Sequence, residues 1–174
     1  MIKTIMALGL LGAMFSCAKP WDNKHVKDVP GDTIKEYEYS YSGTMMWYIT
    51  WNLIERGEDG KLRLLHSEQC SPEITIYKCP DDALAKIDGF VREYKLWNLE
   101  NSYLPKMEVL DGYMWHTSIR YEDASISTGG SNAYPPKKLA AGLSAIESYI
   151  KSIIDSATEA DIIGTDNHFD RRDR

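Results

Sequence analysis

The stretch YMWHTSIRY, residues 113–121, alternates two kinds of side chain, and this alternation decides the fold. Every second residue from Tyr113 to Tyr121 is aromatic, Thr or Ile, whereas Met, His, Ser and Arg stand between them. A period of two is typical of a β-strand that is buried on one face. His116 is therefore expected to face away from Trp115, on the opposite side of the sheet.

Further strands are predicted from similar short runs before and after this stretch. They cover residues 36–41, 45–54, 62–66, 74–78, 107–110 and 125–127. The turn signals Gly57-Glu58-Asp59-Gly60 and Asp111-Gly112 lie between neighbouring runs, which indicates hairpin connections. Because hairpins join antiparallel strands, the sheet should be mainly antiparallel.

Two amphipathic helices are predicted beside this sheet. The first begins at Pro80-Asp81-Asp82, where acidic groups face the positive end of the helix dipole. The second begins near Pro135-Pro136 and carries an apolar stripe at helical spacing, made up of Leu139, Leu143, Ile146, Ile150 and Ile153. The fold class we expect is α+β, in two layers, with both helices on one face of the sheet.

In the segment GGSNAYP, residues 129–135, the first four residues, 129–132, are predicted to break the sheet, and the whole segment is expected to form the corner between a strand and the second helix. Glycines accept positive φ, Asn132 can bond nearby backbone amides, and Tyr134 before a proline is extended. A sharper interpretation is an anion or carbohydrate site at the helix N-terminus, close to Lys137 and Lys138.

Together with Asp111-Gly112 and Trp115, this segment resembles a domain of uncharacterised bacterial proteins that carries a Gly-x-Asn-Ala-Tyr-Pro motif. The resemblance covers roughly residues 80–154 and implies the same fold, but it brings no catalytic role. Asp123-Ala124 stands where that domain carries Asp-Gly in its second turn, so a different turn type is expected here.

The N-terminus has one positive charge, Lys3, followed by an apolar run that is too short to span a bilayer, which needs about 20 residues. MFSC, residues 14–17, resembles the lipobox of a bacterial lipoprotein signal peptide, of the relaxed kind found in the Bacteroidetes. The resemblance implies cleavage of residues 1–16 and lipidation of Cys17. Ala18 rather than Asp follows this cysteine, which favours anchoring in the outer membrane; the leaflet stays open.

The rest of the chain is expected to form a tether over residues 17–35, a single domain over 36–157 and a frayed, charged tail over 158–174. A disulfide between Cys70 and Cys79 suits an exported protein, but nine steps of strand span roughly 30 Å. Both redox states therefore stay open. No spacing of His or Cys indicates a metal or a cofactor, and a net charge of −6 argues against nucleic acid as a partner.

Five Trp and eleven Tyr are many for one small domain. The rings either pack under the helices or form an exposed patch, in which Tyr37, Tyr39, Trp47 or Trp115 would lie in a row on the uncovered sheet face.

The preferred hypothesis is a non-catalytic envelope lipoprotein that binds a protein partner or a glycan through this aromatic face, with Trp47, Trp115, Asn132 and Tyr134 as candidate binding residues. The alternatives are an envelope hydrolase or inhibitor whose site combines His116 with Asn132, and a purely structural accessory subunit.

Overall fold

A computed structural model of the chain describes residues 31, 33–43, 48–69, 71–107, 109 and 112–168, with the backbone alone at residues 48 and 49. The strands are β1 (Glu36–Gly43), β2 (Tyr48–Arg56), β3 (Leu62–Glu68), β4 (Glu73–Lys78), β5 (Ser102–Tyr103), β6 (Tyr113–Arg120), β7 (Ser125–Ser131) and β8 (Ile162–Asn167). The helices are α1 (Ala83–Tyr94) and α2 (Lys137–Ser156), with short 3₁₀ helices at Leu96–Asn98 and Glu159–Asp161.

The described strands form one sheet of eight, in the order β5-β7-β6-β1-β2-β3-β4-β8. All neighbours are antiparallel except β5 and β7, which run parallel. β1 lies in the middle, where Tyr37 is opposite Ile54 of β2 and Ile119 of β6. The expected α+β class with a mainly antiparallel sheet and two helices is confirmed.

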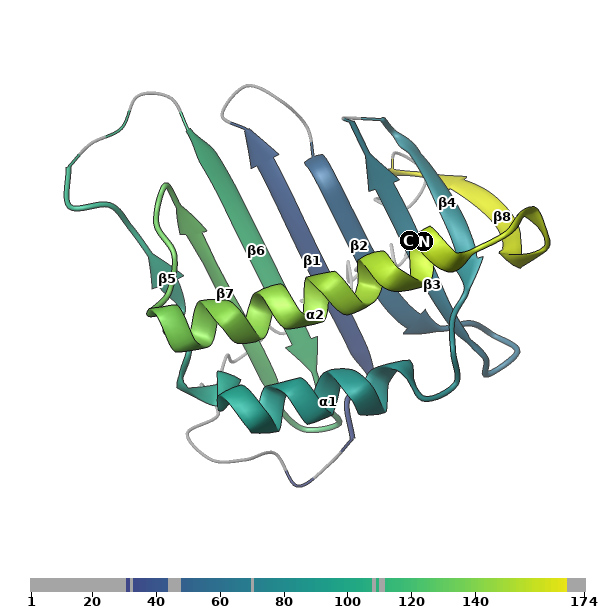
Figure 1. Cartoon of the computed structure of the whole chain (residues 1–174), viewed down its shortest axis with the longest axis horizontal. Coiled ribbons are helices and arrows are strands. Elements are labelled where there is room, and N and C mark those ends of the chain that lie inside the picture. The colour runs from purple at the N-terminus through teal and green to yellow at the C-terminus, as the bar shows by residue number, and fades with distance from the viewer. Residues whose placement is uncertain are drawn as a thin grey trace, which may run out of the picture.

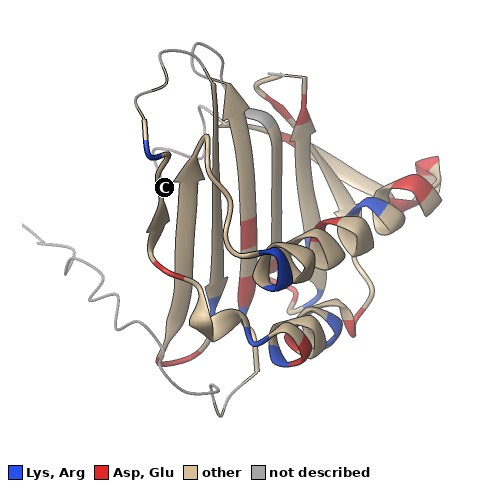
Figure 2. Cartoon of the chain, turned by 60° about the vertical axis from the view of Figure 1, so that its left-hand side comes forward, with Lys and Arg blue, Asp and Glu red and all other residues tan. Residues whose placement is uncertain are grey.

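One large core joins α1 and α2 to the sheet (Figure 1). It contains Tyr37, Ile54, Leu64 and Ile119 from the central strands, together with the apolar stripe of α2. Figures 1 and 2 show the two helices side by side in front of the sheet. Because alternate strand residues point to opposite faces, this core explains why the apolar residues recur at every second position.

A second, smaller cluster lies on the other face of the sheet. Its buried members are Trp51, Leu53, Leu65 and Ile74. The ring of His168, the last described residue, packs edge-on against Trp51 with the centroids 4.8 Å apart. His168 Nε2 also lies 2.8 Å from Ser67 Oγ, so the last described residue packs against this cluster.

The prediction that residues 129–132 break the sheet is wrong, because β7 continues through both glycines to Ser131. The glycines are needed for a different reason, which is the close approach of β6. A Cβ atom at Gly130 would lie 2.5 Å from Trp115 Nε1 and 2.4 Å from the carbonyl oxygen of Ala133. The turn into α2 follows directly after, at residues 132–136.

The frayed tail is also corrected by the structure. Thr158 and Asp161 form a capping box for the second 3₁₀ helix, and β8 then pairs with β4, with Gly164 opposite Ile76. The dense charge of this segment suggested solvation, but an edge strand keeps one side in water and tolerates charge. The described domain therefore continues past residue 157 to His168.

The strand expected at 107–110 is replaced by β5, five residues earlier in the chain. Met107 and Val109 belong to no strand, and residues 108, 110 and 111 lie outside the described part. Leu104-Pro105 follows β5 at once, and a proline removes a donor that a longer strand would need.

The glycines at positions 130 and 89 provide a matched test of this packing. We expect Gly130→Ala to lower the free energy of unfolding by about 1–3 kcal/mol, because the new methyl group collides with Trp115 and Ala133. Gly89 lies in the exposed interior of α1, where an added Cβ would meet no other part of the protein within 4 Å, so Gly89→Ala should raise the free energy of unfolding by about 0.5–1 kcal/mol. Urea unfolding of both variants checks this; equal effects would contradict the close approach.

Candidate functional site

The helix-facing side chains of the central strands change character along each strand. At one level they are apolar, with Tyr37 beside Ile54, and both are fully buried. Four residues further along β1, Tyr41 lies opposite Thr50 and Trp115. Figure 1 shows α2 crossing the sheet short of this end, so the aromatic and polar part of the face is not covered by either helix.

Two adjoining hollows lie between α2 and this part of the sheet, and we call them together the α2 groove. The larger has a volume of about 610 Å³ and the smaller about 350 Å³. Tyr39, Tyr134 and Glu147 line both of them. The remaining residues of the larger hollow are Tyr41, Thr50, Asn52, His66, Glu68, Lys151, Ile154 and Asp155. A concave site of this size, with rings and a few polar groups, is typical of ligand binding.

A set of stacked rings, which we call the aromatic wall, is made up of Tyr41, Tyr113, Trp115 and Tyr134. All of them except Tyr113 line the α2 groove, and Tyr113 stacks on Tyr41 and Tyr134. The ring centroids of Tyr113 and Tyr134 are 5.2 Å apart, and those of Trp115 and Tyr134 are 5.9 Å apart with planes within 8°. Trp115 Nε1 also donates to the carbonyl oxygen of Ala133, at 2.7 Å. Tyr134 is therefore held by its neighbours although 55% of it is exposed.

The floor of the groove holds a carboxyl group from α2. The Tyr37 hydroxyl donates to Glu147 Oε1 at 2.5 Å, and Asn52 Nδ2 donates to Oε2 at 3.0 Å. Desolvation raises the pKa of Glu147 to about 7, and the two hydrogen bonds oppose that rise only in part. Glu147 therefore titrates near neutral pH.

Asn52 connects this carboxyl group to a histidine. Its Oδ1 lies 2.7 Å from His66 Nδ1, and since its Nδ2 already donates to Glu147, Oδ1 accepts and His66 Nδ1 carries the proton. His66 Nε2 is 3.6 Å from a Glu68 oxygen. Burial lowers the pKa of His66, and the nearby Glu68 opposes this, so the imidazole is neutral at pH 7.

Two of the four proposed binding residues belong to the aromatic wall. Trp115 is only 3% exposed, so a ligand cannot reach most of its ring. The accessible ring is that of Tyr134, which stacks on Trp115. Tyr37 is fully buried, and it faces α2 rather than forming a row on an uncovered sheet face. Trp47 lies outside the described residues. The expected aromatic patch is thus displaced to the helix side, because α1 and α2 leave that side partly open.

Asn132 has a structural part in this site. Its φ is +49°, its backbone N–H donates to the Tyr113 carbonyl oxygen, and its Oδ1 accepts from the Tyr113 N–H at 3.1 Å. Asn tolerates the left-handed region better than most residues, which explains its presence at this corner.

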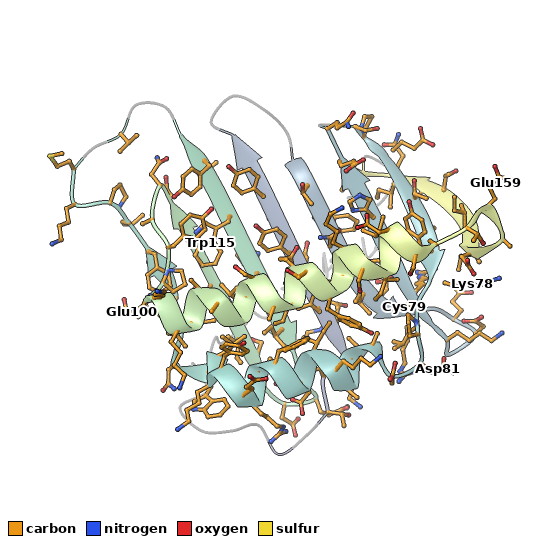
Figure 3. All side chains as sticks on the ribbon, viewed as in Figure 1. Lys78, Cys79, Asp81, Glu100, Trp115 and Glu159 are labelled. Carbon is orange, nitrogen blue, oxygen red and sulfur yellow. The ribbon has the colours of Figure 1, made fainter. Side chains whose placement is uncertain are left out.

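The cysteine positions are only partly described. Cys79 is buried and has no disulfide partner among the described residues, and burial raises the pKa of its thiol to about 12. Cys70 and Cys17 lie outside the described residues, so the disulfide and the lipid attachment stay predictions. Figure 3 shows Lys78, Cys79 and Asp81 at the far end of the sheet from Trp115.

The alternative site at His116 is not assembled in the described structure. His116 faces away from Trp115, as predicted, and its Nε2 lies 3.1 Å from Ser127 Oγ. The hollow that His116 lines includes neither Asn132 nor an acidic residue from the described part of the chain. A hydrolase site combining His116, Asn132 and an acid therefore gains no support from this geometry.

Sequence reasoning missed Glu147, Asn52 and His66 as one group. The available signal was Glu147 itself, which lies four residues after Leu143 and three before Ile150, within the apolar stripe of α2. An acidic residue in such a stripe needs buried partners, but the sequence does not say which strands supply them.

Within the described residues, no group of three or more His, Cys, Asp or Glu could hold a metal ion. No helix found there is long and apolar enough to cross a membrane. Figure 2 shows charged residues on the helices, on loops and on several strands, whereas β6 and β7 carry only Arg120. No family model matches this chain, and no curated protein is significantly similar to it.

The raised pKa of Glu147 predicts a pH dependence of stability. Since the folded state binds this proton up to about pH 7 and the unfolded state only up to about pH 4.5, stability from Glu147 is present at low pH and is lost as pH rises through 7. After allowing for its partial exposure, we expect a loss of about 1–2 kcal/mol between pH 5 and 8. Urea unfolding of wild type and Glu147→Gln at both pH values measures it, and parallel slopes for the two proteins would contradict it.

Proposed function

We propose that this protein is a non-catalytic glycan-binding lipoprotein of the cell envelope, with the α2 groove as its binding site. The proposal treats the domain as two layers, with both helices on one sheet face and the ligand bound where they leave that face open. The single observation that carries it is the aromatic wall, with the exposed Tyr134 ring stacked on Tyr113 and Trp115.

The chemistry of the groove suits a sugar. The C–H face of a pyranose ring is flat and apolar enough to stack on Tyr134, while its hydroxyl groups need donors and acceptors nearby. Asn52, His66 and Glu147 provide both within the same hollow. A concave groove fits a chain of sugar rings better than the flat surface of a folded protein partner, so a glycan is favoured over a protein.

The envelope location rests on the sequence at the N-terminus. A short apolar run ends in Phe15-Ser16-Cys17 and is followed by a polar tether of the kind that would separate a lipid from a domain. A lipid-anchored binding domain in a glycan-rich envelope is consistent with the aromatic groove, with the membrane as partner through Cys17.

The aromatic wall predicts a specific loss of binding. We expect Tyr134→Ala to weaken binding of the best glycan found on an array by at least tenfold, because the exposed stacking surface is removed. The variant also loses two ring contacts, worth about 0.5–1.5 kcal/mol each, so its affinity is measured under conditions in which urea unfolding shows that it is fully folded. Titration calorimetry measures the affinity, with Leu104→Ala, exposed to 73%, as the control. Unchanged affinity in Tyr134→Ala would count against the groove.

The anchor is tested separately in cells of the source organism. We expect the wild-type chain in the membrane fraction and Cys17→Ala largely outside it, because stable anchoring depends on acyl chains at that position. Fractionation with mass spectrometry of the mature N-terminus provides the readout. A Cys17→Ala protein that stays membrane-bound, or a wild-type protein that keeps Met1, would refute the lipoprotein assignment.

A further inference from the structure

Glu147 has a feature that glycan binding alone does not require. Its two described hydrogen-bond partners, Tyr37 and Asn52, are both neutral. No Lys, Arg or His within the described residues forms an ion pair with it. A carboxyl group in a half-buried position without a cation is costly in its charged form, and a ligand cation would remove that cost.

The other charged groups of the α2 groove do not provide this cation. Lys151 lies one helical turn after Glu147 and also lines the larger hollow, but its Nζ forms an ion pair with Asp155 Oδ1, at 2.8 Å, rather than with Glu147. On the sheet side, Glu68 faces His66 at 3.6 Å, and His66 is neutral at pH 7. The hollow thus contains three acidic side chains, Glu68, Glu147 and Asp155, against one lysine.

The rings beside Glu147 are also suited to a cation. Tyr39 and Tyr134 line both hollows next to the carboxyl group. In addition, Tyr41 lines the larger hollow and Trp115 lines the smaller one. The faces of such rings attract ammonium groups, by about 0.5–1 kcal/mol at exposed sites and more when desolvated. A carboxylate together with several ring faces is the arrangement that recognises an alkylated or protonated amine.

We propose that the α2 groove selects a glycan that carries a positively charged amino group, with Glu147 as its counter-ion and the rings of Tyr39 and Tyr134 around the ammonium carbons. This inference rests on the proposed glycan binding and specifies its substrate class: an amino sugar with a free or alkylated amine, in place of the neutral acetamide.

The test compares two β-1,4-linked glucosamine oligosaccharides of equal length, one N-trimethylated and one N-acetylated. The trimethylated probe keeps its charge at every pH, so changes with pH report on the protein. Titration calorimetry at pH 8 is expected to show at least tenfold tighter binding of the charged probe to wild type. Glu147→Gln should abolish this preference. Glu93→Gln removes the charge of an exposed carboxyl group on α1 and serves as the control, so it should keep the preference.

Two further measurements test the proposal even if Glu147→Gln fails to fold. Lys151→Met removes an exposed charge and should bind the trimethylated probe severalfold more tightly than wild type. In wild type, the affinity for that probe should fall at least threefold from pH 8 to pH 6, as Glu147 takes up a proton while Tyr37 and Tyr39 stay protonated. Burial lowers the pKa of His66, and any charge that it gains in this range is common to both proteins, so the affinity of Glu147→Gln should fall much less than that of wild type.

The outcomes separate the two proposals. Equal binding of both probes, or a charge preference that survives in Glu147→Gln, overturns the amine selectivity and leaves glycan binding intact. Failure of either probe and of every glycan on the array to bind wild type overturns the proposed function, and the inference with it.

Discussion

The contact of Trp115 with the backbone of Gly130 and Ala133 is the constraint on which the site depends. The indole lies so close to Gly130 that only hydrogen fits there, and its N–H is bonded to the Ala133 carbonyl oxygen. These contacts fix the end of β7 and the turn from which α2 departs. The direction of α2 then determines how much of the sheet is covered, and hence where the groove opens and where Glu147 meets β1 and β2.

A second consequence concerns the cost of placing Glu147 on the apolar stripe of α2. An aliphatic residue there would pack against the sheet with no desolvation penalty. The carboxyl group instead accepts hydrogen bonds from Tyr37 and Asn52, which join α2 to two strands. Buried polar groups of this kind stabilise little by themselves but fix one geometry, which suits a site that must recognise a ligand.

The sequence predicted those parts of the fold that local periodicity controls. The alternation in β6 gave the right faces for Trp115 and His116, and the stripe of α2 identified its buried side. It failed where distant segments decide. Gly130 looks like a sheet breaker unless the Trp115 ring is known to lie against it, and Gly129 looks like one unless the close backbone of β6 is known. In the same way, β8 looks like a solvated tail unless it is known to pair with β4. Tyr134 was found as a candidate, whereas Glu147, Asn52 and His66 come from three elements that only the tertiary structure brings together.

The sheet is open, and the features of its two described edges bear on self-association. β5 pairs through only two residues and runs at once into Leu104-Pro105. β8 has an irregular register beside Ile76 and Tyr77, and Asp161 and Asp166 accompany it. Short length, proline, irregular pairing and negative charge all discourage the addition of a strand from another chain. Both margins of the sheet can thus be exposed with little tendency to polymerise into fibrils.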